Sequence, residues 1–343
     1  MPREFGPAIT SIGKGLPEHA FSNQQIIDDF GVDSSDEWIR TNVGIKQRYI
    51  AGPEQATSDF AVAAATNALE RARLKASDID HVIVATATPD YLFPSTAVLV
   101  QDRLGANAGA HDVMAACTGG IYALADMCSM HEADLIEINK SLVIGAETLT
   151  RHVNWEDRGT AVLFGDGAGA VVIENIPNPG LMKFVLGADG SQAKSLYIPS
   201  GGSRNPITEQ VLEEGNDAII MNGPKTFKHA VNRMSEAAEE VMQKAHLTDA
   251  LGNIDTRHID HVIPHQANVR IMNAVWNRFG LPVEKRVSKI EKYGNTSAAS
   301  IFIAMNDAYE DGTIKKDDVL LLVAFGAGFT YGAAVLQWQL ENK

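Results

Sequence analysis

Apolar positions along the chain fall in two patterns, one typical of buried strands and the other of amphipathic helices. Residues 58–74 place Phe60, Ala64 and Ala68 on or beside one face, which predicts a helix. Residues 82–86 form a continuous apolar run, which is typical of a strand buried on both faces. Because strands and helices alternate in this way along the chain, we expect a layered α/β protein.

The expected elements cover most of the sequence. Strands are expected at residues 7–12, 82–86, 142–147, 261–263 and 319–324, and helices at 24–30, 34–39, 58–74, 121–130, 227–245 and 266–279. Residues 160–173 are predicted to form a strand, a glycine-rich turn and a second strand. Residues 174–220, which contain several proline and glycine residues, are expected to form a linker and an inserted flap.

Two stretches of sequence recur in the same order, which indicates an internal duplication. ASDIDHVIV at 76–84 resembles TRHIDHVIP at 256–264, and FGDGAGAVVI at 164–173 resembles FGAGFTYGAAVL at 325–336. Chance could produce one such pair, whereas two pairs in one order are much harder to explain by chance.

The duplication predicts two halves of one βα topology, residues 1–175 and 176–343. A chain of 343 residues is long enough for two such units. Equivalent loops of the two halves would then face each other, and side chains from both could meet in one cleft.

Charge and cysteine content narrow the class of protein. The formal net charge of −14 argues against a nucleic-acid partner, since phosphates require a basic surface. Two cysteines do not make a disulfide framework, which favours a reducing compartment. The N-terminus lacks the apolar core of a signal peptide, and no stretch reaches the roughly 18 apolar residues of a membrane span. We therefore expect a cytoplasmic protein with no membrane segment.

Residues 112–122, DVMAACTGGIY, deliver Cys117 among small side chains directly before an expected helix. At a helix start, free N–H groups and the helix dipole favour the thiolate form, which is the reactive form of a nucleophile. A buried unreactive cysteine fits the stretch equally well, and burial is the commoner fate of cysteine. Cys128, about three helical turns further on, is expected to pack in the core.

Two polar residues of the second half accompany Cys117. His265 leaves an expected strand at the position equivalent to Ala85, where it would be held at a defined depth in a cleft. Asn295 precedes another small-residue helix start. Taken singly, His265 could be a core histidine and Asn295 a helix cap.

Cysteine, histidine and asparagine in this order serve two chemistries. In a papain-like hydrolase the asparagine orients the histidine that activates the cysteine. In a thioester condensing enzyme the cysteine carries an acyl group, while histidine and asparagine hydrogen-bond the carbonyl of a second thioester. The duplication favours the condensing enzyme, because a papain-like fold has no such repeat.

The chain resembles the β-ketoacyl-acyl carrier protein synthase III family of the thiolase-like superfamily over nearly its whole length. The resemblance rests on motifs in the family's order and spacing: SSDEWI (34–39), GI (44–45), FPS (93–95), AACTGG (115–120), DRGTAVLFGDGAGAVV (157–172), HQANVRI (265–271), GNTSAAS (294–300) and FGAGFTYGA (325–333). It implies a duplicated, five-layered α-β-α-β-α fold and a homodimer. It also implies coenzyme A and acyl carrier protein thioesters as substrates, with no metal or other cofactor.

The resemblance further implies a decarboxylating Claisen condensation that starts fatty-acid synthesis, and it assigns roles to single residues. Cys117 would be the acylated nucleophile, and His265 and Asn295 would promote decarboxylation. The other implied roles are an oxyanion hole at Cys117 and Ala327, an adenine site at Trp38 and Arg158, a pantetheine tunnel at Gly223, Phe227 and Asn268, an acyl-pocket contact to the partner subunit at Phe93, and carrier-protein docking at Lys228 and Arg270.

Two positions depart from the family pattern. Gly120 stands where an aromatic residue is common, so we expect a wider or redirected acyl pocket. Asn42 replaces an arginine near the coenzyme A contact, which weakens the case for coenzyme A as sole acyl donor. The main alternative is therefore a specialised synthase or acyltransferase of secondary metabolism. A biosynthetic thiolase is less favoured, since it needs a second, basic cysteine near the end of the chain.

Overall fold

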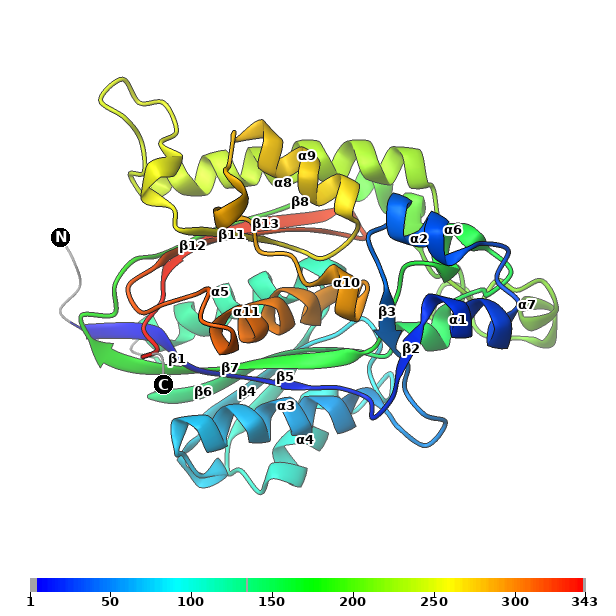
Figure 1. Cartoon of the computed structure of the whole chain (residues 1–343). Coiled ribbons are helices and arrows are strands. Elements are labelled where there is room, and N and C mark those ends of the chain that lie inside the picture. Colours follow the sequence, from blue (N-terminus) through cyan, green and yellow to red (C-terminus); the bar gives the residue numbers. More distant parts are fainter. Residues whose placement is uncertain (1–4, 134, 342–343) are drawn as a thin grey trace.

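Two β-sheets and three layers of helices build the protein (Figure 1). The computed structural model describes residues 5–133 and 135–341. In Figure 1, helices cover the outer face of each sheet and further helices fill the space between the sheets. This is the five-layered α-β-α-β-α arrangement that the family resemblance implies.

The first sheet has five strands in the order β1-β7-β6-β4-β5. Their bounds are β1 (Phe5–Gly15), β7 (Gly167–Pro177), β6 (Lys140–Glu147), β4 (His81–Ala85) and β5 (Gly109–Val113). β4 runs parallel to β5 and β6, whereas β7 is antiparallel to β1 and β6. The strand β5, which the sequence pattern did not predict, lies at the edge of this sheet.

The second sheet repeats this arrangement with four strands in the order β8-β13-β12-β11. Their bounds are β8 (Met182–Ala188), β13 (Thr330–Gln337), β12 (Val319–Gly326) and β11 (His261–Pro264). β11 is parallel to β12, and β13 is antiparallel to both its neighbours, so order and direction match β1-β7-β6-β4. This order and direction are what the proposed duplication requires, and its expected boundary after residue 175 falls near the end of β7.

Eleven α-helices lie in the described residues. They are α1 (Asn23–Phe30), α2 (Asp36–Asn42), α3 (Thr57–Ala72), α4 (Thr96–Leu104), α5 (Gly119–Glu132), α6 (Arg158–Ala161), α7 (Glu209–Glu213), α8 (Gly223–Lys244), α9 (Val269–Arg278), α10 (Ile290–Tyr293) and α11 (Ser300–Glu310). Two short strand pairs complete the fold, β2 (Ala20–Ser22) with β3 (Gln47–Tyr49) and β9 (Leu196–Tyr197) with β10 (Ile220–Met221). No helix in the described part of the chain is both long and apolar enough to cross a membrane.

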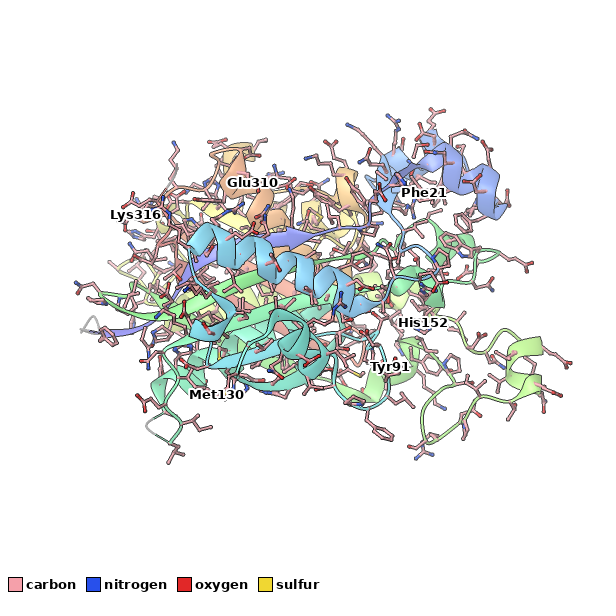
Figure 2. All side chains as sticks on the ribbon, turned by 90° about the horizontal axis from the view of Figure 1, so that it is seen from below. Phe21, Tyr91, Met130, His152, Glu310 and Lys316 are labelled. Atoms are coloured by element: carbon pink, nitrogen blue, oxygen red, sulfur yellow. The ribbon has the colours of Figure 1, made fainter. Side chains whose placement is uncertain are left out.

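The central layer is formed by α5 and α11, and the sequence explains why. Ten consecutive residues of α11, from Ser300 to Tyr309, are buried, which is typical of a helix packed on all sides. The side chains of Ile121, Leu124 and Phe302 form one core with residues of both sheets. On the outer faces, α3 and α4 pack on the first sheet, as Figure 2 shows from below, and α8 packs on the second.

Two predictions from the sequence pattern were wrong. Residues 160–164 do not form a strand, because Asp157 caps the short helix α6 by accepting the N–H of Gly159. The segment 174–220 is more than a linker and flap, since it contains the end of β7 and the whole of β8. The alternation in β8 is weak, because this edge strand exposes several of its side chains.

Candidate active site

Cys117 lies in a one-turn 3-10 helix, η2 (Ala116–Thr118), which joins β5 to α5. The preceding Ala116 has a φ of 46°, a left-handed backbone conformation that is uncommon outside glycine. The turn at the end of β12 packs directly on it. A Cβ added to Gly326 would stand 2.8 Å from the Cys117 nitrogen, and the Thr330 hydroxyl donates to the Ala115 carbonyl over 2.9 Å. Cys117 is therefore held between elements of both sheets.

The expectation that the helix start would by itself favour a Cys117 thiolate is not supported by the surroundings of the thiol. Burial raises the pKa of Cys117 to about 12, and the negative charge of Glu147 raises it further. The nearby Ser297 hydroxyl acts in the opposite direction and lowers the pKa of the thiol. These surroundings favour the thiol form of Cys117 over the thiolate.

His265 comes directly after β11, and its backbone N–H donates to the Val323 carbonyl over 2.8 Å. Its Nδ1 lies 2.7 Å from the Ser300 hydroxyl, and the same hydroxyl oxygen accepts the N–H of Gln266 over 3.3 Å. This arrangement lets Ser300 donate its hydrogen to Nδ1, which leaves the proton of a neutral imidazole on Nε2. Burial lowers the pKa of His265 to about 3, so the ring is neutral and Nε2 is a hydrogen-bond donor.

Asn295 precedes the 3-10 turn η7 (Ser297–Ala299), which leads into α11. Its side-chain oxygen accepts the backbone N–H of Ser297 over 2.9 Å. Its backbone N–H donates to the Leu163 carbonyl, and its carbonyl accepts from the N–H of Gly165. With its oxygen occupied, the Asn295 side chain has its NH₂ group to offer to a ligand. As expected for a cap-like asparagine, it also fixes the turn η7.

A cavity of about 590 Å³ joins these three residues to the surface. Its lining includes all of the residues predicted for the nucleophile, the decarboxylation pair and the coenzyme A contacts: Cys117, His265, Asn295, Trp38, Arg158, Gly223, Phe227 and Asn268. We call it the Trp38 cavity. At its mouth the Arg158 guanidinium lies 4.9 Å from the centre of the Trp38 ring, a cation–π contact. An aromatic ligand placed between the two would have to move them apart.

Asn42, which replaces an arginine common in the family, lies at the mouth of the Trp38 cavity. Asn42 lines this cavity, and its side-chain oxygen accepts a hydrogen bond from the Arg270 guanidinium. Its side-chain NH₂ donates to the Trp38 carbonyl over 2.8 Å. The sequence predicts carrier-protein docking for Arg270, and the structure places this residue in the cavity lining as well. Position 42 carries no cationic group in this chain, but Arg270 of α9 supplies one at the same place.

A second cavity, of about 930 Å³, meets Cys117 from the other side, and we call it the Tyr91 cavity. Ala327 lines it together with Cys117, Ser297 and Thr88. Tyr91 and His152, which are labelled near one another in Figure 2, also belong to its lining. Phe93 does not line it in this chain, and its side chain is 87% exposed.

Gly120 does not line either of the two cavities, although its sequence position predicts a contact with the acyl pocket. It is buried in α5. A Cβ added there would stand 2.8 Å from the Ala298 carbonyl oxygen and 3.3 Å from the ring of Phe302. The glycine therefore allows close packing of α5 against η7 and α11, and the expected widening or redirection of the acyl pocket stays a prediction. Lys228 also lies outside both linings, exposed on α8.

Three residues of the site were missed from the sequence, namely Ser297, Ser300 and Glu147. Both serines stand in the GNTSAAS motif at 294–300, where their small polar side chains could have suggested support for Asn295 and His265. Glu147 ends an apolar strand and is completely buried, a position at which a carboxyl is rare. A glutamate at the end of an expected buried strand was the feature of the sequence that could have identified Glu147 as a residue of the site.

Comparison with known proteins shows the family of the chain. Residues 111–190 match the family model described as 3-oxoacyl-[acyl-carrier-protein] synthase III, and residues 250–338 match the model of its C-terminal part. A protein from Caldanaerobacter subterraneus named β-ketoacyl-[acyl-carrier-protein] synthase III is 47% identical over 98% of this chain and 99% of its own length.

Solved structures show the same relationship. The Thermus thermophilus β-ketoacyl-[acyl carrier protein] synthase III is 42% identical, with a TM-score of 0.86 over 96% of this chain and 99% of that one. The priming β-ketosynthase of the R1128 polyketide pathway is 31% identical, with a TM-score of 0.88 over 100% and 99%. The chain therefore belongs to the 3-oxoacyl-[acyl-carrier-protein] synthase III family.

Proposed function

We propose that this enzyme condenses an acyl thioester with malonyl-acyl carrier protein, with loss of CO₂, to give a 3-ketoacyl-acyl carrier protein at the start of fatty-acid synthesis. The observation that carries the proposal is the Trp38 cavity, which brings Cys117, His265 and Asn295 to the inner end of one channel. Family membership supplies the substrate class.

In the first half-reaction the sulfur of Cys117 attacks the carbonyl carbon of the acyl thioester. The backbone N–H groups of Cys117 and Ala327 are proposed to stabilise the oxyanion. Gly326 packs against the Cys117 nitrogen, and Thr330 ties the 326–330 turn to Ala115, which keeps these two donors together. Collapse of the intermediate releases coenzyme A as a thiol and leaves an acyl-cysteine.

In the second half-reaction the malonyl thioester enters with its carbonyl oxygen between His265 Nε2 and the Asn295 amide. Loss of CO₂ places negative charge on this oxygen, where two preorganised donors in a dry site stabilise it most. A neutral His265 suits this role, since Ser300 leaves its proton on Nε2. The enolate carbon then attacks the carbonyl carbon of the acyl-cysteine, the bond between this carbon and sulfur breaks, and the 3-ketoacyl thioester forms with release of the Cys117 thiolate.

The test is to measure the two half-reactions separately. Intact-mass measurement with a series of acyl-coenzyme A donors should show one acyl group on Cys117, and adding malonyl-acyl carrier protein should convert it to a 3-ketoacyl product. His265→Ala and Asn295→Ala should still acquire the acyl group but should not decarboxylate the malonyl thioester. Normal turnover in either variant would remove the basis of the proposal.

A specialised synthase that primes secondary metabolism is the second candidate. The likeness to the R1128 priming ketosynthase supports it, as does the volume of about 930 Å³ in the Tyr91 cavity beyond Cys117. The same acyl series distinguishes the two. A short-chain optimum favours the fatty-acid role, and selective acylation by long or branched donors favours the specialised one.

A carrier protein and a second copy of the chain are the proposed partners. Lys228 and Arg270 lie near the start of α8 and of α9, and both are exposed on a chain with a net charge of −14. They would meet the acidic carrier protein. For the homodimer, the edge strand β5 and the exposed Leu92, Phe93 and Met114 form the candidate interface. Light scattering of Phe93→Asp should then show a shift from dimer to monomer.

A further inference from the structure

Arg48, the middle residue of β3, is completely buried. One terminal nitrogen of its guanidinium donates to the Ala161 carbonyl over 3.0 Å, and the other donates to the Asn23 side-chain oxygen over 3.2 Å. Both acceptors are uncharged, and the Nε–H has no hydrogen-bond partner among the described residues. Burial lowers the pKa of Arg48 to about 10, so the group is still a cation at neutral pH. Burying a cation without a paired carboxylate is unfavourable, which points to a role beyond packing.

The first of the two contacts reaches the helix that carries Arg158. Ala161 is the last residue of α6, and Arg158 is the first. A carbonyl at a helix C-terminus lacks a partner within the helix, and a guanidinium is a suitable donor for it. Arg48 therefore holds one end of a helix whose other end carries a side chain at the mouth of the Trp38 cavity.

The second contact reaches the helix that carries Trp38. The side-chain NH₂ of Asn23 donates to Asp36 Oδ1 over 2.9 Å and to the Ile45 carbonyl over 2.7 Å. Asp36 is the first residue of α2, two positions before Trp38. Because Asn23 is also completely buried, water does not compete for the amide that links Arg48 to α2.

Arg48 thus connects the two helices whose side chains meet at the cavity mouth. The Arg158 guanidinium lies 4.9 Å from the centre of the Trp38 ring, and both residues line the Trp38 cavity. Arg48 lines neither cavity, so it can act on a ligand only through these two helices. With the backbones of α2 and α6 linked, an aromatic ring enters between Trp38 and Arg158 by rotation of their side chains and not by separation of the helices.

We propose that Arg48 is a positioning residue, which holds α2 and α6 at the spacing that Trp38 and Arg158 need to bind the purine ring of an acyl-coenzyme A donor. The inference rests on the proposed function, in which acyl-coenzyme A is the first substrate. It adds that recognition of the nucleotide depends on a buried cation that never touches it.

The test compares acyl transfer to Cys117 from acyl-coenzyme A and from the same acyl group on pantetheine, which lacks the nucleotide. Intact-mass measurement follows both reactions. The native enzyme should have a lower KM for the coenzyme A ester, and equal KM values would overturn the proposal. If neither donor acylated Cys117, the proposed function itself would fail, and the inference with it.

Arg48→Met removes the guanidinium and keeps the Cβ, which lies 3.2 Å from the position of a Cβ added to Gly165. The KM for acyl-coenzyme A should rise about tenfold or more, while kcat and the reaction with acyl-pantetheine should stay within about twofold. Arg48→Lys keeps a cation that can reach one of the two oxygens, so it should recover part of the lost affinity. Equal losses with both donors, or no loss with either, would contradict the positioning role.

Asn23→Ala gives the same test without changing the arginine. It breaks the link to α2 and leaves the Ala161 contact, so it should also raise the KM for acyl-coenzyme A selectively. Because both substitutions break one link, the double variant with Arg48→Met should be no worse than the weaker-binding single variant, and additive losses would overturn the shared link.

Arg286→Met is the matched control. This half-buried arginine donates to the Leu281 carbonyl and lies 5.8 Å from the centre of the Trp276 ring, but it lines neither cavity. Its loss should lower the thermal stability and leave the ratio of the two KM values unchanged. A similar change of this ratio in Arg286→Met would show that general destabilisation, and not the spacing of α2 and α6, causes the effect.

Discussion

Two turns of this molecule have the same backbone shape and opposite roles. The turn η2 begins at Ala116 with a φ of 46° and passes into the central helix α5, and the turn η7 begins at Ser297 with a φ of 46° and passes into the central helix α11. A left-handed conformation without glycine costs about 1 kcal/mol or more, so both turns are held by their surroundings. They are equivalent under the proposed duplication.

The residue directly after the strained one differs between the two turns. In η2 it is Cys117, whose side chain reaches both cavities. In η7 it is Ala298, which is packed closely against Gly145 and Gly119. The two halves thus repeat one turn. The residue after the left-handed position differs, so that η2 carries the proposed nucleophile and η7 supports the packing around it. A substitution in η2 should accordingly change the chemistry, and a substitution in η7 should change the stability of the fold.

The largest effect on activity is expected in η2, the turn that carries Cys117. Cys117→Ala should abolish acylation completely, because the acyl group has no sulfur to bind. Intact-mass measurement after incubation with an acyl-coenzyme A checks this. Stability should change little, since the side chain borders open cavities. A protein that still forms the adduct would show that another residue is the nucleophile.

The next effect concerns the donors that the second turn supports. His265→Ala and Asn295→Ala should each lower the condensation rate by about a hundredfold or more, since one preorganised donor is worth about 3 kcal/mol. Acylation of Cys117 should persist within a few-fold. The measurement is the ratio of malonyl decarboxylation to acyl transfer, and equal losses of both activities would contradict separate roles for the two sets of residues.

Substitutions in η7, the supporting turn, should lower the stability of the protein. Ala298→Val should lower the free energy of unfolding by about 1–3 kcal/mol, because the added methyl groups have no space between the packed elements. Cys117→Val makes a similar change at the equivalent position of η2 and should cost less, since that side chain faces the cavities. Urea unfolding of both variants is the check, and equal costs would contradict the distinction.

Gly120 gives a related prediction with a simple control. Gly120→Ala should destabilise the protein by about 1–2 kcal/mol, because its Cβ would stand 2.8 Å from the Ala298 carbonyl oxygen. Gly190→Ala places its Cβ where no atom lies within 4 Å, so its effect should be within about 0.5 kcal/mol. Thermal unfolding compares the two. An altered acyl-chain preference in Gly120→Ala with unchanged stability would support the expectation drawn from the sequence.

The smallest effect is expected at Ser300, which acts on His265 alone. Ser300→Ala removes the hydroxyl that holds the Nδ1 side of the ring, so part of the protein would carry the proton on the wrong nitrogen. A lost hydrogen bond of this kind corresponds to about a tenfold decrease in the condensation rate. Acyl transfer to Cys117 should not change, and a matching loss there would show that Ser300 has a wider structural role.

Local sequence determined a large part of this picture. The spacing of apolar residues predicted α3, α8 and the strands β1, β4, β6, β7, β11 and β12, and Ser22 caps α1 as such a residue should. The duplicated segments 76–84 and 256–264 both lead into parallel strands at the same place in their sheets. Cys117, His265 and Asn295 were identifiable because each stands at the junction of a strand or turn with a helix. Such junctions depend on residues close together in the chain.

Tertiary structure decided what depends on residues far apart in the chain. Glu147 came close enough to Cys117 for its charge to raise the pKa of that thiol, and Arg270 came to lie beside Asn42. The packing around Gly120 was also beyond the sequence, because a Cβ added there would stand 2.8 Å from the Ala298 carbonyl oxygen of η7. The pKa of Cys117 was also beyond the sequence, since burial and a buried carboxylate outweigh the local helix start. Burial and charge at a point are sums over neighbours that only the folded chain brings together.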